Sequence, residues 1–231
     1  MPRFVNLDDV VRVAKQLATL DTRLVFTGGS IITLLLDQPS LSSVRVTNDV
    51  DVIAEVLTRI QYTDLEACLR AIGFRHDTSE DAPICRWIVD GIKVDVMPMH
   101  DPSGTLCNPW FKIAVATAQH RQVQGQPLLL VTAPCFLAMK IVAFNDRGGG
   151  DFRGSHDLED ILSVVDGRAA LADELAQADE SLRKFVSAAL GGFLADERFL
   201  ESLPGHLLPD EASQKRLPGL EHKLRAIAAL R

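Results

Sequence analysis

Phe26-Thr27-Gly28-Gly29-Ser30 and Asn48-Asp49-Val50-Asp51-Val52 are the two segments that decide the fold of this chain. In the first, a short β-type run ends in a glycine pair, which permits a tight turn and a close approach of the backbone to a ligand. Apolar residues 31–36 follow and predict a buried helix, whose first N–H groups suit a phosphate. We therefore expect a nucleotide-phosphate site formed by Gly28, Gly29 and Ser30.

The second segment carries two carboxylates on one face of a predicted strand, because successive strand residues alternate between faces. Asp49 and Asp51 would repel each other without a cation between them, and their oxygens suit Mg²⁺. A third carboxylate, Asp95, follows the two-residue turn Asp90-Gly91, which is a strong hairpin signal. If its strand pairs with the Asp49 strand, the three aspartates could hold two Mg²⁺ ions, or Mn²⁺, for an in-line phosphoryl displacement. The alternative is an ordinary glycine turn followed by surface aspartates.

The composition is that of a globular protein with a sizeable core, since 47% of the 231 residues are hydrophobic and 24% are charged. A net charge of −7 argues against a strongly basic nucleic-acid-binding surface, although it leaves room for a local basic patch. The start of the chain lacks a signal-peptide hydrophobic region, and no apolar run is long enough to span a bilayer. The four cysteines are dispersed, as is typical of reduced thiols. We expect a cytoplasmic protein without a membrane partner.

The secondary-structure pattern changes near residue 130. Before it, predicted helices and strands alternate; after it, the chain reads as helical to the end. We expect an α+β fold, with a mixed β-sheet domain with helices over residues 1–130 and an all-helical domain over 131–231 that completes the active site. Within the first part, Asn6 predicts a helix start, residues 38–47 a loop, and the capping-box pattern of residues 63–66 another helix start.

A second group of candidate residues lies in the predicted helical part. Lys140 is the only charge between Val131 and Asp146, so it either extends to solvent or faces a carboxylate or phosphate, and we expect it to bind nucleotide phosphate. A glycine-rich loop that begins at Arg147 follows. Asp157 and Asp160 then share one face of the next predicted helix, where the helix dipole alone would also favour acidic residues. Four C-terminal cations could contact RNA or form a solvated face: Lys215, Arg216, Lys223 and Arg225.

These motifs resemble the nucleotidyltransferase superfamily related to DNA polymerase β, whose signature is Gly-Gly/Ser, then Asp-x-Asp, then an Asp on a later strand. The Lys140 helix, the Arg/Gly loop and the run His156-Asp157-Leu158-Glu159-Asp160-Ile161 further resemble the AbiEii/AbiGii toxin-like group, including the MenT type. The resemblance covers residues 23 to 168.

The resemblance implies transfer of NMP from an NTP to an acceptor hydroxyl. It implies that Asp49 and Asp51 bind metal, that Lys140 contacts nucleotide, and that Asp157 or Asp160 supports the site. We add Asp95 as a third metal ligand and base, and Arg147 as a nucleotide-binding cation. The group's toxins act on the 3′ end of tRNA and are neutralised by a separate antitoxin, so tRNA and an antitoxin are expected partners. This chain departs from the group in being acidic and short.

Two other classes of function stay open. One is a nucleotide-sensing module of the same fold without turnover. The other is a phosphohydrolase of the haloacid-dehalogenase type, but those enzymes favour Thr or Val two residues after the second Asp, where this chain has Ile53. A protein hydroxyl or a small molecule are alternative acceptors.

Overall fold

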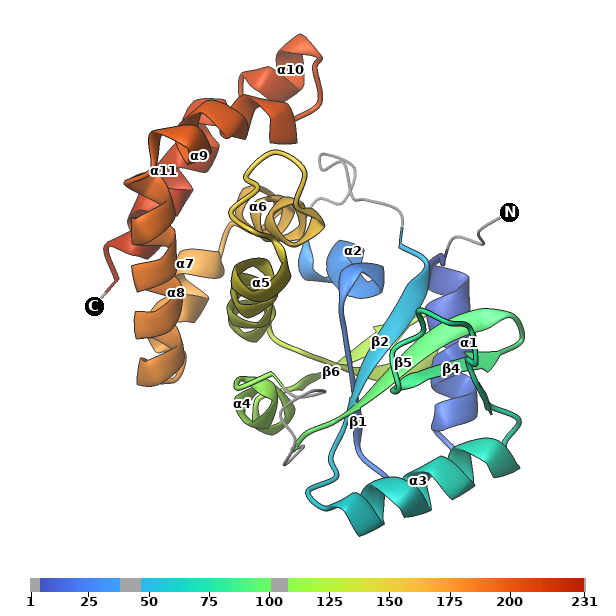
Figure 1. Ribbon diagram of the computed structural model, residues 1–231. Helices are drawn as coiled ribbons and strands as arrows, with labels where there is room; N and C mark the ends of the chain where they lie inside the picture. Colours follow the sequence, from blue (N-terminus) through green and yellow to red (C-terminus); the bar gives the residue numbers. More distant parts are fainter. Residues whose placement is uncertain (1–4, 38–46, 101–107, 231) are drawn as a thin grey trace. The chain divides into compact units, whose positions relative to one another are not determined.

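The computed structural model describes residues 5–37, 47–100 and 108–230 (Figure 1). These residues form two compact units. The first holds residues 5–31, 47–100 and 108–132, and the second holds residues 32–37 and 133–230. Residues 38–46 of the loop expected at 38–47 lie outside the described part of the chain. Among the described residues, no helix is both long and apolar enough to cross a membrane.

The described residues of the first unit form a mixed sheet of seven strands in the order β3-β4-β5-β2-β1-β7-β6. β2 pairs parallel with β5 and antiparallel with β1, and β1 pairs parallel with β7. The Asp95 strand therefore pairs with the Asp49 strand, which is the condition that the three-carboxylate site requires. The strands are β1 (Leu24–Thr27), β2 (Asp49–Ala54), β3 (Arg75–His76), β4 (Arg86–Val89), β5 (Ile92–Pro98), β6 (Gln119–Val123) and β7 (Gln126–Leu130).

Two hairpin turns set the register of the outer strands. The predicted turn between β4 and β5 is confirmed: Asp90 and Gly91 both have positive φ, at 50° and 73°, as a tight two-residue hairpin requires. Gln124 and Gly125 form a similar turn between β6 and β7, with φ of 49° and 76°. Because a two-residue turn leaves no slack, each hairpin fixes which side chains face one another across the strands.

Helices α1 (Leu7–Leu17), α3 (Arg59–Ala71) and α4 (Phe111–Ala116) complete the first unit, together with the 3-10 turn η1 (Gly29–Ile31). α1 begins as predicted at Asn6, which forms a capping box with Asp9. The predicted start of the next helix at residues 63–66 is wrong. α3 begins one turn earlier, because Thr58 and Gln61 form the capping box.

Alternation along β2 separates the core from the polar face of the sheet. Val50 and Val52 are fully buried, whereas Asp49 and Asp51, which alternate with them, are partly exposed. On the apolar side, α3 packs against the sheet and the Tyr62 hydroxyl donates a 2.9 Å hydrogen bond to the carbonyl of Val96 in β5. The carboxylates of β2 therefore project from the polar face of a sheet whose other face is buried.

The described residues of the second unit are helical, as predicted for the part of the chain after residue 130, and they also include residues 32–37, which the sequence placed in the first domain. Its long central helix α5 buries most of its side chains and lies beside α6, α7 and α8. Four phenylalanines from α5, α8, α9 and the α5–α6 loop pack with ring centroids 5.2–5.7 Å apart: Phe144, Phe152, Phe193 and Phe199. The helices are α2 (Ile32–Leu35), α5 (Ala133–Arg147), α6 (His156–Gly167), α7 (Leu171–Gln177), α8 (Glu180–Leu194), α9 (Glu197–Ser202), η3 (Leu203–His206), α10 (Glu211–Gln214) and α11 (Leu217–Ala228).

The helix expected over residues 31–36 is shorter than predicted. η1 covers one 3-10 turn, and α2 ends at Leu35. The Leu35 carbonyl accepts a 2.7 Å hydrogen bond from Arg168, and the N–H of Asp37 donates to the carbonyl of Gly167. These long-range bonds satisfy the backbone where a longer helix would have continued, and they attach α2 to the end of α6.

Candidate active site

Four neighbouring strands place one polar residue each in a row across the sheet. Arg86 of β4 lies opposite Asp95 of β5, Asp95 lies opposite Asp51 of β2, and Asp51 lies opposite Thr27 of β1. Asp49 lies two residues before Asp51 on the same face of β2. The row ends beside the glycine turn, since Gly28 follows Thr27. The structure thus brings the three predicted carboxylates and the glycine turn onto one face of the first unit.

Arg86 is the residue that the sequence analysis missed. Its guanidinium donates two hydrogen bonds to Asp95, at 2.7 Å from Nε and 2.8 Å from Nη2, and a third at 2.8 Å to Oδ2 of Asp49. The hairpin could have revealed it, because a two-residue turn at positions 90 and 91 pairs residue 86 with residue 95. The position of Arg86 opposite Asp95 could be predicted from the hairpin. Its additional bond to Asp49 could not.

The electrostatics of this group are those of a partly buried ion cluster. Hydrogen bonding to Asp95 raises the pKa of Arg86 above its ordinary value, with further support from Asp49, so the guanidinium stays charged. The side chains of Arg86, Asp49 and Asp95 are 17%, 27% and 11% exposed, which limits screening by water. Oδ1 of Asp49 also accepts a 2.9 Å hydrogen bond from the hydroxyl of Thr47.

Gly28 is required twice over at its position. Its φ is +75°, a conformation that side-chain-bearing residues rarely adopt, and a Cβ atom placed on it would lie 1.8 Å from Oδ2 of Asp51. The Asp51 carboxylate therefore packs directly on the glycine backbone. Close by in the chain, the buried hydroxyl of Ser30 has no hydrogen-bond partner among the described residues. Such an orphaned hydroxyl beside a bare glycine backbone fits an anionic ligand.

Replacement of Gly28 by alanine should separate the effect of Gly28 on ligand binding from the effect of backbone strain. Gly28→Ala and Gly125→Ala each place a side chain at φ near +75°, so each is expected to lose about 1–2 kcal/mol of unfolding free energy. Only the Gly28 variant must also displace Asp51, because the space around Gly125 is open. Urea unfolding and calorimetry with Mg²⁺ and NTP should show weaker ligand binding for Gly28→Ala alone. Equal ligand binding by both variants would contradict the assignment.

The donor chemistry of the row suits a divalent cation, since carboxylate oxygens are the ligands that Mg²⁺ prefers. Within the described residues, no three acidic, thiol or imidazole side chains are already arranged to enclose a metal ion. At the row, Arg86 bonds to both oxygens of Asp95 and to one of Asp49. The residues fit a metal that binds with rearrangement of Arg86.

The second predicted group forms its own ion cluster between α5 and α6, which lie side by side (Figure 1). Nζ of Lys140 lies 3.0 Å from Oδ1 of Asp157 and 2.6 Å from Oδ2 of Asp160. Arg147 adds two hydrogen bonds to Asp157, at 2.8 and 2.9 Å. The side chains of Asp157 and Asp160 are only 6% and 1% exposed. Lys140 therefore faces carboxylates within its own unit, and both candidate acids contact it.

Proton affinities within this cluster follow from its partners. Burial opposes charge on Lys140, but Asp160 and Asp157 outweigh it and raise the pKa of the ammonium. Burial likewise opposes charge on Asp157, but hydrogen bonds from Arg147 and Lys140 lower the pKa of this carboxyl. Lys140 and Asp157 are therefore both charged at neutral pH.

The basic residues considered for RNA contact also have acidic or carbonyl partners. Lys215 pairs with Glu211 at 2.6 Å, Arg216 with Asp166 at 3.1 Å and Arg225 with Glu221 at 3.8 Å. Lys223 donates a hydrogen bond to the backbone carbonyl of Asp166. These contacts partly neutralise the C-terminal basic group, so its positive charge is weaker than the sequence indicated.

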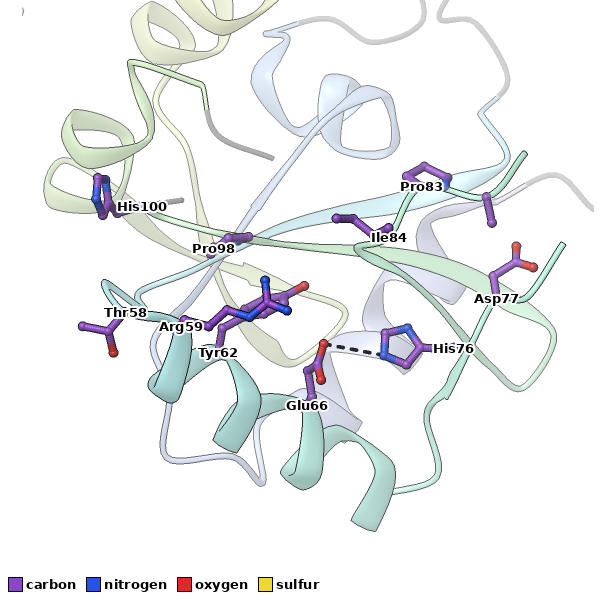
Figure 2. A pocket seen from close by; sticks show the side chains of 11 residues that line it. Thr58, Arg59, Tyr62, Glu66, His76, Asp77, Pro83, Ile84, Pro98 and His100 are labelled. Carbon is purple, nitrogen blue, oxygen red and sulfur yellow. Dashed lines mark ion pairs between the residues drawn. The ribbon is translucent and has the colours of Figure 1, made fainter. Parts of the chain in front are cut away.

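A pocket of about 390 Å³ opens elsewhere in the first unit, between α3 and strands β3 and β5 (Figure 2). Its wall includes Tyr62, His76, Ile84 and His100, and His76 lies 3.7 Å from Glu66. None of the predicted site residues lines it. The row that contains Asp51 and this pocket are therefore separate features of the same unit.

Comparison with known proteins supports the fold. No family model matches the chain, and no curated protein matches it. Among solved structures, an antigenic nucleotidyltransferase-like protein from Paracoccidioides brasiliensis aligns over 97% of this chain and 95% of that chain, with 19% identity and a TM-score of 0.60. The chain therefore has a nucleotidyltransferase-like fold.

Two structures of ANT(2″)-Ia also match, more weakly. The complex with adenylyl-2″-tobramycin aligns over 81% of this chain and 98% of that chain, with 13% identity and a TM-score of 0.47. The solution structure aligns over 82% and 92%, with 14% identity and a TM-score of 0.45. The fold assignment rests on the first comparison and on the sheet topology.

Proposed function

We propose that this protein is a nucleotidyltransferase that transfers NMP from an NTP to an acceptor hydroxyl. One observation carries the proposal: three carboxylates on adjacent strands lie in a row that ends at a glycine turn, with the Asp51 carboxylate packed on Gly28. The orphaned Ser30 hydroxyl beside that turn supports a phosphate ligand. Carboxylates next to a phosphate-binding turn require a cation between them, which suits metal-assisted phosphoryl transfer.

The glycine turn and the three carboxylates of the row each have a role in this proposed chemistry. Gly28, Gly29 and Ser30 bind the triphosphate, and Asp49, Asp51 and Asp95 hold Mg²⁺, with Mn²⁺ as the alternative. When bound, the cation neutralises charge on the phosphate oxygens. Asp95 accepts the proton of the acceptor hydroxyl. The hydroxyl oxygen then forms a bond to the α-phosphorus, and the bond from that phosphorus to the pyrophosphate leaving group breaks.

The acceptor that we propose is the 3′ end of tRNA, as the AbiEii/AbiGii resemblance implies. In the same way, the resemblance supports a role as the toxin of a toxin–antitoxin pair in the cytoplasm. Binding of nucleotide by Lys140 and Arg147, and support from Asp157 or Asp160, stay predictions, because these groups already neutralise one another in the second unit.

The test is incubation of the protein with each radiolabelled NTP, Mg²⁺ or Mn²⁺, and total RNA. We expect label from one NTP to appear on RNA of tRNA size, and to stay absent when the divalent cation is chelated. Label on protein, or on a small molecule, would support nucleotidyl transfer but show that the acceptor is not tRNA. Release of phosphate without transfer would favour the phosphohydrolase alternative.

The structure also gives one argument for a second candidate function, a nucleotide-sensing module without turnover. Arg86 already bonds to both oxygens of Asp95 and to Asp49, as a permanent replacement for catalytic metal would. This alternative predicts saturable NTP binding by calorimetry with no label transferred to any acceptor. The two functions therefore differ in turnover, and they differ in what Arg86 does when metal is added.

A further inference from the structure

Within the described part of the chain, Arg86 is the cation that pairs with two aspartates of the row, Asp49 and Asp95. Asp49, Asp51 and Asp95 carry three negative charges on one face of two adjacent strands, and the Arg86 guanidinium supplies one positive charge to them. Like charges this close destabilise one another unless a cation lies among them. Arg86 therefore solves in the free protein the same electrostatic problem that a metal ion would solve.

Arg86 uses the atoms that a metal would need. Both Asp95 oxygens and Oδ2 of Asp49 accept its hydrogen bonds, and Oδ1 of Asp49 accepts one from Thr47. A bidentate guanidinium–carboxylate pair is directional and strong, so it is not displaced without a competing cation. At the same time, the Arg86 side chain is long and 17% exposed, and its own strand β4 lies next to the edge strand of the sheet. The side chain can move without disturbing the core.

We propose that Arg86 holds the metal site closed in the free protein and that a divalent cation binds by displacing it from Asp49 and Asp95. Arg86 then acts as a built-in competitor that lowers the affinity for free metal. A charge of +2 then replaces the +1 of Arg86 beside Asp49 and Asp95, so the exchange becomes favourable when metal arrives together with an anionic nucleotide. The inference rests on the proposed function only through the metal site.

The test is a titration of the purified protein with Mn²⁺ in the absence of nucleotide, in which electron paramagnetic resonance measures the concentration of free Mn²⁺. Arg86→Gln removes the competitor, and we expect it to bind Mn²⁺ at least about tenfold more tightly than the natural protein. Lys93→Gln is the matched control: Lys93 lies opposite Asp49 on β5 and is exposed, so its loss removes nearby charge without freeing these oxygens. We expect that control to change the affinity less than about threefold.

A second measurement avoids the risk that Arg86→Gln unfolds. In the natural protein, the ¹⁵Nε resonance of Arg86, assigned through the Arg86→Lys variant, should shift saturably as Mg²⁺ is added. Unchanged Mn²⁺ affinity in Arg86→Gln, an equal gain in Lys93→Gln, or an Arg86 resonance that ignores Mg²⁺ would each overturn the inference.

Failure of the inference can be told from failure of the proposed function. If the Arg86 variants bind metal like the natural protein but label transfer to an acceptor persists, Arg86 is not a competitor and the function stands. If no NTP yields transferred label, the function fails, whereas a tenfold gain in Mn²⁺ affinity would still support the competition at Asp49 and Asp95.

Discussion

Replacement of Lys140 by methionine is expected to lower the free energy of unfolding by about 3–5 kcal/mol, the cost of removing one partner from a buried ion pair. Lys140 lies 3.0 Å from Asp157 and 2.6 Å from Asp160, and the Asp160 side chain is only 1% exposed. Methionine keeps the volume and apolar character of the stem, so the loss reports the uncompensated carboxylates and not a cavity. Arg147 still contacts Asp157, which leaves Asp160 as the main source of the penalty.

Urea unfolding of Lys140→Met measures this loss, with Lys184→Met as the matched control. Lys184 pairs with Glu180 one helical turn away on α8, and its side chain is 62% exposed, so its removal should cost less than about 0.5 kcal/mol. Adding Asp160→Asn to Lys140→Met should recover part of the loss, since the amide carries no charge. Native stability of Lys140→Met combined with weaker NTP binding would instead support the role predicted from sequence, a lysine that binds nucleotide phosphate.

The strands and turns near the row could be predicted because their determinants are local. Asp90-Gly91 demands positive φ at two consecutive residues, and few structures other than a tight hairpin accept that conformation. The alternation of Asp49 and Asp51 with valines likewise defines a strand with one apolar face. Once both strands are known, parallel pairing of β2 and β5 brings Asp51 opposite Asp95.

The features that could not be predicted depend on distant partners. The apolar run after Ser30 suits a helix to residue 36, but bonds from Arg168 and to Gly167 end α2 at Leu35. The sequence offers two capping-box patterns for the start of α3; the structure forms the one at Thr58, and Tyr62 in the first turns of this helix bonds to Val96, 34 residues away. Local sequence cannot rank such alternatives, because tertiary contacts supply the deciding free energy.

The same distinction applies to charged residues. A lysine in the apolar helix α5 predicted an anionic partner for Lys140, and the structure supplies two carboxylates from α6 in place of a phosphate. Arg86, by contrast, follows an irregular polar segment and carries no pattern of its own. Its importance comes from the register of a hairpin and the reach of a guanidinium across two strands.

Asp51→Asn is expected to reduce the rate of nucleotidyl transfer by at least about 10²–10³-fold, since loss of a metal ligand removes several kcal/mol of transition-state stabilisation. Asp51 is the central member of the row, opposite both Thr27 and Asp95, and its carboxylate packs on Gly28. The amide has nearly the same shape, so it keeps that packing, and it removes one of three mutually repelling charges. We therefore expect the unfolding free energy to change by less than about 1 kcal/mol.

Initial rates of label transfer and urea unfolding, measured on the same preparations, check both parts of this prediction. Asp64→Asn is the matched control, because Asp64 is an exposed aspartate of α3 in the same unit and lies outside the row. We expect it to leave the rate and the stability unchanged. Full activity in Asp51→Asn would show that the reaction does not depend on the carboxylate row. A rate loss that is matched by a large loss of stability would mean instead that Asp51 supports the glycine turn. Loss of transfer in a fully stable Asp51→Asn protein, with Asp64→Asn intact, is the result that assigns the chemistry to this face of the sheet.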